Sequence, residues 1–261
     1  FNSSYLYTFL YTYREQSIEN VEKKLYEMKD LIFSSSEYRK SSIETRALRI
    51  RLCTTKHTDV FKDLPFLLRD PELIISDAQS ILNVSLLQFA QWWEVKYSDA
   101  ILDIAKARKS EEWVDQLVAN YHGNRSVAAM SALLCLLSDL TAGRGPYSSP
   151  TRVKFVYQEF PDESSSSMAM LNLRKGQVSS PIIFTLSSSV TYLVAVEANC
   201  MEVQSSFGYT LTVLFSVYHL FNLEYPPKVK DLYAVIELLA GCRKGYTSGM
   251  LKLLADEILS R

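Results

Sequence analysis

The stretch FSVYHLFNLEYPPKVKDLYAVIELL, residues 215–239, decides how the second half of this chain folds. It begins as an apolar, aromatic run, stops at two adjacent prolines and restarts with apolar residues at helical spacing. Proline lacks an amide hydrogen and restricts the residue before it, so one helix cannot pass through Pro226 and Pro227. Pro227 suits the first turn of a second helix. The sequence therefore predicts a helix, a corner and a helix, with His219 packed in the core rather than acting as a base.

Helical periodicity also dominates the first half of the chain. The pair Asp70-Pro71 is typical of a helix start. From Ser85 to Lys109 an apolar stripe predicts a long amphipathic helix whose opposite face bears charge. That stripe contains Leu86, Phe89, Ala90, Trp93, Tyr97, Ile101 and Ile104. The run from Val127 to Leu140 is apolar on nearly all sides, which predicts a central helix.

Between about residues 150 and 205 the pattern changes from helical spacing to alternation and β-branched residues. Residues 151–160 alternate, and two or three antiparallel strands fit the region that follows, at Ile182–Leu186, Thr191–Glu197 and Met201–Gln204. Helices are expected again from about Gly208. The predicted fold class is mainly α: a helical bundle with a small antiparallel β-meander inserted before the C-terminal helices. We expect residues 1–145 and 146–261 to pack together as one domain.

Composition excludes several classes of protein. The chain has 261 residues, 48% hydrophobic and 22% charged, with a net charge of −1, so the surface as a whole is not built to bind nucleic acid. No apolar run reaches the length of a membrane span. Four cysteines and three histidines stand apart without ligand spacing, which predicts no metal site and favours free thiols in a reducing, intracellular compartment, cytoplasmic or nuclear.

A candidate partner-binding seam follows the first residues of the chain. Apolar residues recur at spacings of three and four, as at the a and d positions of a coiled coil, with Glu and Lys between them. The seam consists of Ile18, Val21, Leu25, Met28 and Ile32. Two heptads are too few to predict a free-standing coiled coil. Packing within the chain's own domain and a dimer seam therefore remain alternatives.

The most basic segment runs from Ser36 to His57, where six basic side chains stand against two acidic ones. The pair Ser41 and Glu44 fits a capping box, which predicts a helix start there. The basic side chains are Arg39, Lys40, Arg46, Arg49, Arg51 and Lys56. A solvated helix face is the ordinary interpretation of such a run, and a face that follows a phosphate backbone is the alternative.

The corner also carries a family resemblance. Asn222-Leu223-Glu224-Tyr225-Pro226, then Lys228 or Lys230, then the closing GMLKLLADEIL resemble the C-terminal region of a group of uncharacterised vertebrate proteins, abundant in fish. Similar segments occur in order, such as VEKKLYEMKDLI and RSVAAMSALLCLLSDL, so the resemblance covers roughly residues 18 to 258. Members of that group often carry a sterile-alpha-motif or PB1 domain in front, and some resemble products of mobile elements. The resemblance implies no catalytic residue. The aromatic start, residues 1–13, has no counterpart in it.

Motifs of chemistry are absent from the sequence. It contains no phosphate-binding glycine loop, nucleophile elbow, zinc-protease motif or calcium loop, and adjacent carboxylates such as Glu111-Glu112 face apart on a helix. We therefore expect no enzyme and no cofactor, but a non-catalytic scaffold domain that associates with itself or with a protein partner. The alternative is a nucleic-acid-binding module of mobile-element origin that uses the basic helix at residues 39–56.

Overall fold

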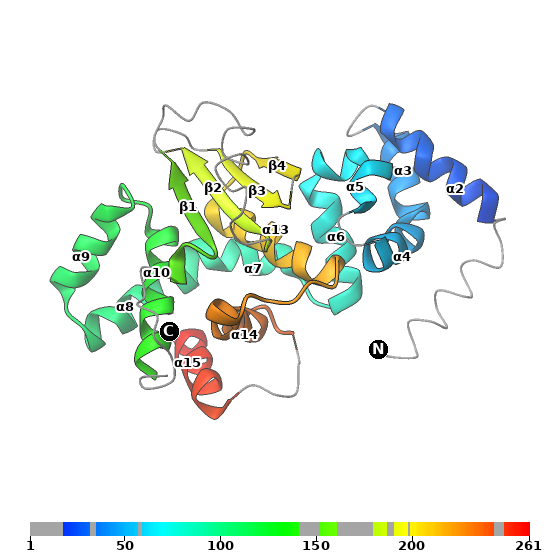
Figure 1. The fold of residues 1–261 in the computed structure, drawn as a ribbon. Coiled ribbons are helices and arrows are strands. Elements are labelled where there is room, and N and C mark those ends of the chain that lie inside the picture. The colour runs from blue at the N-terminus through cyan, green and yellow to red at the C-terminus, as the bar shows by residue number, and fades with distance from the viewer. Residues whose placement is uncertain are drawn as a thin grey trace.

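The computed structural model describes residues 18–31, 35–56, 59–140, 152–160, 180–186, 191–197, 199–242 and 248–261 (Figure 1). The aromatic start of the chain, residues 1–13, lies outside the described residues. In the first part of the chain the elements are α2 (Ile18–Glu27), η1 (Met28–Asp30), α3 (Ser36–Glu44), α4 (Arg46–Lys56), α5 (Val60–Asp63), η3 (Pro65–Leu68), α6 (Pro71–Leu82), α7 (Leu86–Trp92), the π-helical turn η4 (Trp93–Tyr97), α8 (Ser98–Arg108), α9 (Glu111–Asn120) and α10 (Arg125–Leu140).

The second part holds a small sheet and then the last helices. Its elements are β1 (Tyr157–Phe160), β2 (Ile182–Leu186), β3 (Tyr192–Val196), β4 (Asn199–Val203), α13 (Phe207–Leu220), η5 (Pro227–Val229), α14 (Lys230–Leu239) and α15 (Gly249–Ser260). The predicted fold class is therefore confirmed: the chain is mainly helical, and the strands precede the C-terminal helices.

The strands lie in the order β1-β2-β3-β4. The pairs β2–β3 and β3–β4 are antiparallel, with Val194 opposite both Ile183 and Met201, so the predicted meander is confirmed. Strand β1 adds a parallel neighbour to β2, which makes the sheet mixed. Residues 151–160 alternate in sequence, but alternation alone does not specify which strand they join or in which direction.

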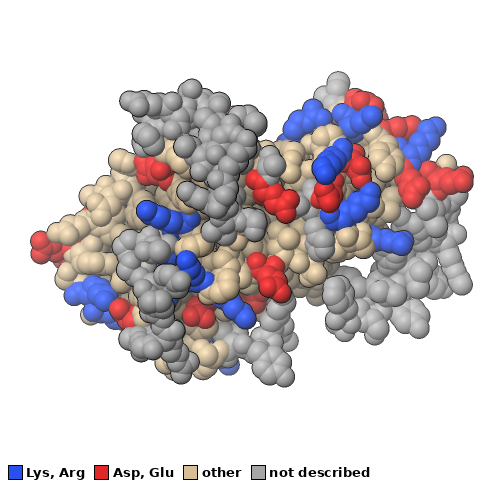
Figure 2. Space-filling view, viewed as in Figure 1, with Lys and Arg blue, Asp and Glu red and all other residues tan. Residues whose placement is uncertain are grey.

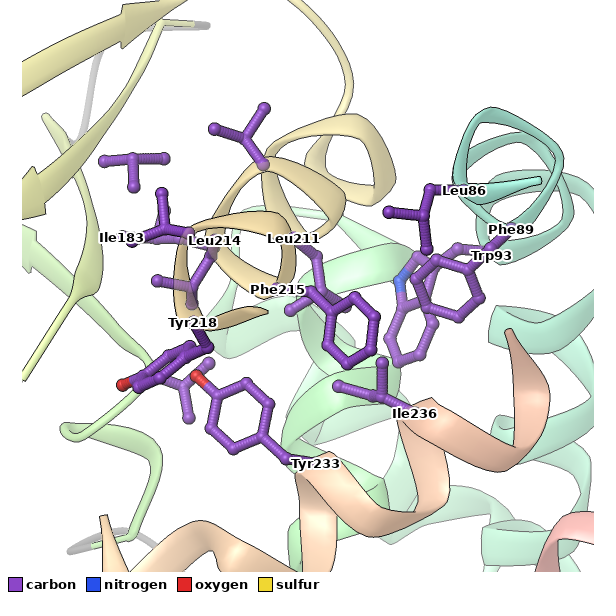
Figure 3. Close-up of a cluster of buried hydrophobic side chains, with 14 of the residues drawn as sticks. Leu86, Phe89, Trp93, Ile183, Leu211, Leu214, Phe215, Tyr218, Tyr233 and Ile236 are labelled. Atoms are coloured by element: carbon purple, nitrogen blue, oxygen red, sulfur yellow. The ribbon is translucent and has the colours of Figure 1, made fainter. Parts of the chain in front are cut away.

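Helix α13 occupies the middle of the molecule. It contacts α6 and α7 on one side and strands β2 and β3 on another, and nearly all of its residues are buried. Figure 3 shows its side chains Leu211, Leu214 and Phe215 pointing into a cluster that Trp93 and Ile236 enter from other helices. A helix that is apolar on nearly all sides must be covered on nearly all sides, and here the sheet and the helices α4, α6, α7 and α10 do so.

The corner after α13 forms as the two prolines predict. The helix ends at Leu220, Asn222 takes a left-handed φ of 50°, and Pro227 begins the short turn η5 that leads directly into α14. Gly241 closes α14 with a φ of 78°, a backbone conformation in which glycine carries no steric penalty. The corner folds α14 back beside α10.

Helix starts are partly as predicted. Asp70 caps α6, since its carboxylate accepts a hydrogen bond from the Leu73 amide at 3.1 Å, with Pro71 in the first turn. The capping box predicted at Ser41 is wrong, because Ser41 lies inside α3. The cap of that helix is Ser35, whose hydroxyl accepts from the Tyr38 amide at 3.1 Å.

The long helix predicted from Ser85 to Lys109 exists, with one π-helical turn inside it. At this turn Ser98 donates its hydroxyl to the Trp93 carbonyl at 2.6 Å. Glu94, within the turn, accepts from the Gly208 amide at the start of α13 and from the Ser126 hydroxyl of α10. The turn thus aims one carboxylate at the N-terminal ends of two other helices, where helix dipoles favour negative charge.

Candidate interaction surfaces

The predicted seam lies inside the chain's own core. Val21, Leu25 and Met28 are 3%, 0% and 1% exposed, and α2 packs against α3 and α4. Met28 also accepts a hydrogen bond at its Sδ from the Thr45 hydroxyl, at 3.2 Å. The prediction that these three residues bind a partner is therefore wrong, because side chains without exposed surface cannot contact a second molecule. Ile18 begins α2, and Ile32 lies outside the described residues.

Three of the six basic side chains in the basic segment form ion pairs within the chain. Arg49 is 0% exposed, and its guanidinium meets both oxygens of the Asp77 carboxylate, at 2.7 and 2.9 Å. Arg46 lies 3.5 Å from the same carboxylate, and the Lys56 ammonium pairs with Asp63 at 2.6 Å. Full burial raises the pKa of Asp77, and the Arg49 guanidinium acts against that rise.

Four of the predicted nucleic-acid contacts are exposed, namely Arg39, Lys40, Arg51 and Lys56, and the last of these is paired with Asp63. Arg49 is a structural residue, so its prediction as a phosphate contact is wrong. On the face that Figure 2 shows, acidic and basic side chains are interspersed over the α2–α5 region and form no continuous basic stripe. Mixed charge of this kind gives little of the counterion release that drives binding to a phosphate backbone.

The corner brings together Tyr225, Glu237 and His219, whose side chains are of types that serve in acid–base catalysis. The Tyr225 hydroxyl donates to Glu237 at 3.0 Å and lies 2.8 Å from Nε2 of His219. The Tyr225 ring stacks on Tyr233, with centroids 4.4 Å apart and planes 2° from parallel. The His219 and Glu237 side chains are only 8% and 12% exposed. His219 is packed in the core, as predicted.

This corner cluster is suited to bracing α13 against α14. Burial raises the pKa of the Tyr225 phenol far above its ordinary value, and the Glu237 carboxylate raises it further. A phenol held protonated is a poor nucleophile or base. In the described ranges, no group of three or more His, Cys, Asp or Glu side chains could hold a metal ion.

An exposed apolar face lies on the outer side of α7 and η4, and the sequence interpretation missed it. We define this surface, the α7 face, by Leu87, Gln88, Gln91, Trp92 and Val95, all of which are exposed. Val95 is 68% exposed, Leu87 49% and Trp92 39%. The predicted buried stripe of this helix is confirmed, but its opposite side bears charge only beyond Val95.

A sequence signal for this face does exist. Residues 78–93 contain no charged side chain, although they include both the buried and the exposed side of α7. The two charged residues that follow are bonded within the chain: Glu94 accepts from α13 and α10, and Lys96 donates to the Leu259 carbonyl of α15 at 2.9 Å. The exposed side is therefore apolar and amide-bearing, without a formal charge on its five residues.

Comparison with protein-family models, curated proteins and solved structures finds no match to this chain. The resemblance to the uncharacterised vertebrate group therefore stays a prediction. No single described helix is long and apolar enough to cross a membrane, and α6 with the α7–α8 helix passes that test as a pair bent by 112°.

Proposed function

We propose that this chain is a non-catalytic interaction domain that binds protein through the α7 face. The single observation that carries the proposal is the exposure of Trp92 and Val95 on a helix face whose five residues carry no charge. Tryptophan is enriched at interfaces and charged residues are depleted at their centres. An exposed apolar group of this kind has a cost in water that a partner surface would remove.

The cluster of His219, Tyr225 and Glu237 supports the non-catalytic part of the proposal. Its members hydrogen-bond to one another, and the two ionisable groups most suited to proton transfer are almost fully covered. A general acid or base has to reach a substrate. Their positions fit a role in holding α13 against α14 better than a role in catalysis.

A photo-crosslinking amino acid at Val95 tests the proposal in cells. We expect covalent adducts with protein from Val95, and none from the same group placed at Ile43 of α3. Ile43 is the matched control, because it is 65% exposed against 68% for Val95. Equal adduct yield at both positions would count against the α7 face as the binding surface.

Binding to nucleic acid is tested separately with the purified chain. A short duplex is added to the purified chain at low and moderate salt, and binding is followed by light scattering. We expect no complex at moderate salt. A complex that survives moderate salt, and that is lost when Arg39, Lys40 and Arg51 are changed to Glu, would replace the proposal with the nucleic-acid alternative.

A further inference from the structure

We infer that the protein seated on the α7 face is a second copy of this chain, packed antiparallel about a two-fold axis. The inference rests on the proposed function and names its partner. Closed two-fold dimers are the commonest assemblies of identical chains, and in them one patch contacts itself. A patch can contact a second copy of itself only if side chains of like charge do not face each other across the two-fold axis.

The α7 face satisfies that condition. None of its five residues is charged, so two copies meet there without like-charge repulsion. Glu94 and Lys96, the nearest charged residues in sequence, are committed to their own chain: Glu94 to the amide of Gly208 and Lys96 to the carbonyl of Leu259. The face therefore needs no oppositely charged partner to complete it.

The order of residues on the helix also suits a self-contact. In an antiparallel pair centred between Gln91 and Trp92, Gln91 of one copy lies against Trp92 of the other. Gln88 then faces Val95, and Leu87 faces the methylene stem of Lys96. Because the Lys96 ammonium is held by α15, that stem is available as apolar surface. Each exposed apolar residue thus meets an uncharged group.

The contact extends beyond α7. Ten helical residues span only about 15 Å, whereas a stable interface covers about 800 Å² on each partner. The Leu259 carbonyl of α15 accepts from the Lys96 ammonium, and the Leu259 side chain is 38% exposed, so α15 offers apolar surface next to Lys96. We therefore expect Leu259 to contribute to the dimer.

Sedimentation equilibrium of the purified chain, at concentrations up to about 100 μM, tests the inference. We expect a reversible dimer, with a dissociation constant raised about 30-fold or more by Trp92→Ala and by Val95→Glu. Ile43→Glu, the control of similar exposure, should leave it unchanged. Circular dichroism should show all three variants folded, since none of these side chains is buried.

The outcomes separate this inference from the proposed function. A wild-type chain that stays monomeric throughout that range overturns the inference, and so does a dimer equally sensitive to Ile43→Glu. If such a monomer still gives crosslinks from Val95 to a different protein, the proposed function stands and the second copy is the wrong partner. If neither dimer nor crosslink forms, both fail.

Discussion

Arg49 of α4 and Asp77 of α6 face each other as a two-bonded pair, with N–O distances of 2.7 and 2.9 Å and no exposed surface on either side chain. The same guanidinium donates to the Ser42 carbonyl and to the Thr45 hydroxyl, both at 2.6 Å. The pair joins the N-terminal helices to α6, which in turn packs on α13. Further polar contacts lie around it, including the buried hydrogen bond from the Tyr38 hydroxyl to Asp70 at 2.8 Å.

Removal of one partner of this pair should destabilise the fold. Arg49→Met removes both hydrogen bonds to the buried Asp77 carboxylate and leaves only Arg46, 3.5 Å away, and such breaks cost about 3–5 kcal/mol. Arg51→Met, two residues along the same helix but exposed, should change the free energy of unfolding by about 0.5 kcal/mol or less. Urea denaturation compares the two. Equal losses would contradict the structural role of Arg49.

Gly208 should tolerate no side chain. A Cβ added there would lie 2.7 Å from the Ala90 carbonyl oxygen and 3.0 Å from the Trp93 Cβ, so α13 and α7 would have to separate. We expect Gly208→Ala to cost about 1–3 kcal/mol. Gly249→Ala is the control: nothing lies within 4 Å of its added Cβ. At a helix position with room, alanine should stabilise by about 0.4–1 kcal/mol. Thermal melts should move the two variants in opposite directions.

The corner prolines and the core should differ sharply in their effect on stability. Phe215 is fully buried, with its ring centroid 4.5 Å from that of His219, and Phe215→Ala should cost about 3–5 kcal/mol. Pro227→Ala should cost about 1 kcal/mol or less, because an exposed proline at a helix start mainly pre-sets φ. Chemical denaturation that ranks the variants in the reverse order would overturn this account of the corner.

Alkaline pH should unfold the protein rather than titrate its tyrosines one by one. Burial raises the pKa of Tyr97 to about 12, and it raises the pKa of Tyr225 and Tyr233 further. A phenol whose folded pKa is raised contributes stability that is full below its unfolded pKa near 10 and is lost as the pH rises through the folded value. Tyrosinate absorbance and circular dichroism should therefore change together above about pH 10. A helical signal that stays intact while the absorbance rises to that of all 16 tyrosinates would contradict this.

Local signals in the sequence predict much of this fold. The prolines at 226 and 227 place the corner, and the change of period between about residues 150 and 205 places the meander, because both depend on neighbours in the chain. The spacing of Val21, Leu25 and Met28 correctly predicts one apolar helix face. It does not say whether that face meets this chain or another, since an a/d pattern is the same in both cases.

The rest depends on contacts between distant segments. Nothing near Arg49 in the sequence indicates that Asp77 lies opposite it. The sequence pattern therefore does not distinguish this buried arginine from an exposed one. The π-helical turn that holds Glu94 is fixed by Gly208, 114 residues later. The pairing of β1 with β2 joins residues separated by a long connection. Periodicity cannot encode such partners.

The central place of α13 has a consequence for how the chain is made. Synthesis runs from the N-terminus, so α6, α7 and α10 emerge well before residues 207–220, against which they pack. Until then, apolar surfaces of the first half have no cover and the Glu94 carboxylate has no amide from α13. A nascent chain stopped before residue 207 should therefore be a client of chaperones and sensitive to proteolysis. The helix that completes the interior leaves the ribosome after the helices it covers, so these contacts are non-local and we expect them to form more slowly than contacts between neighbouring helices.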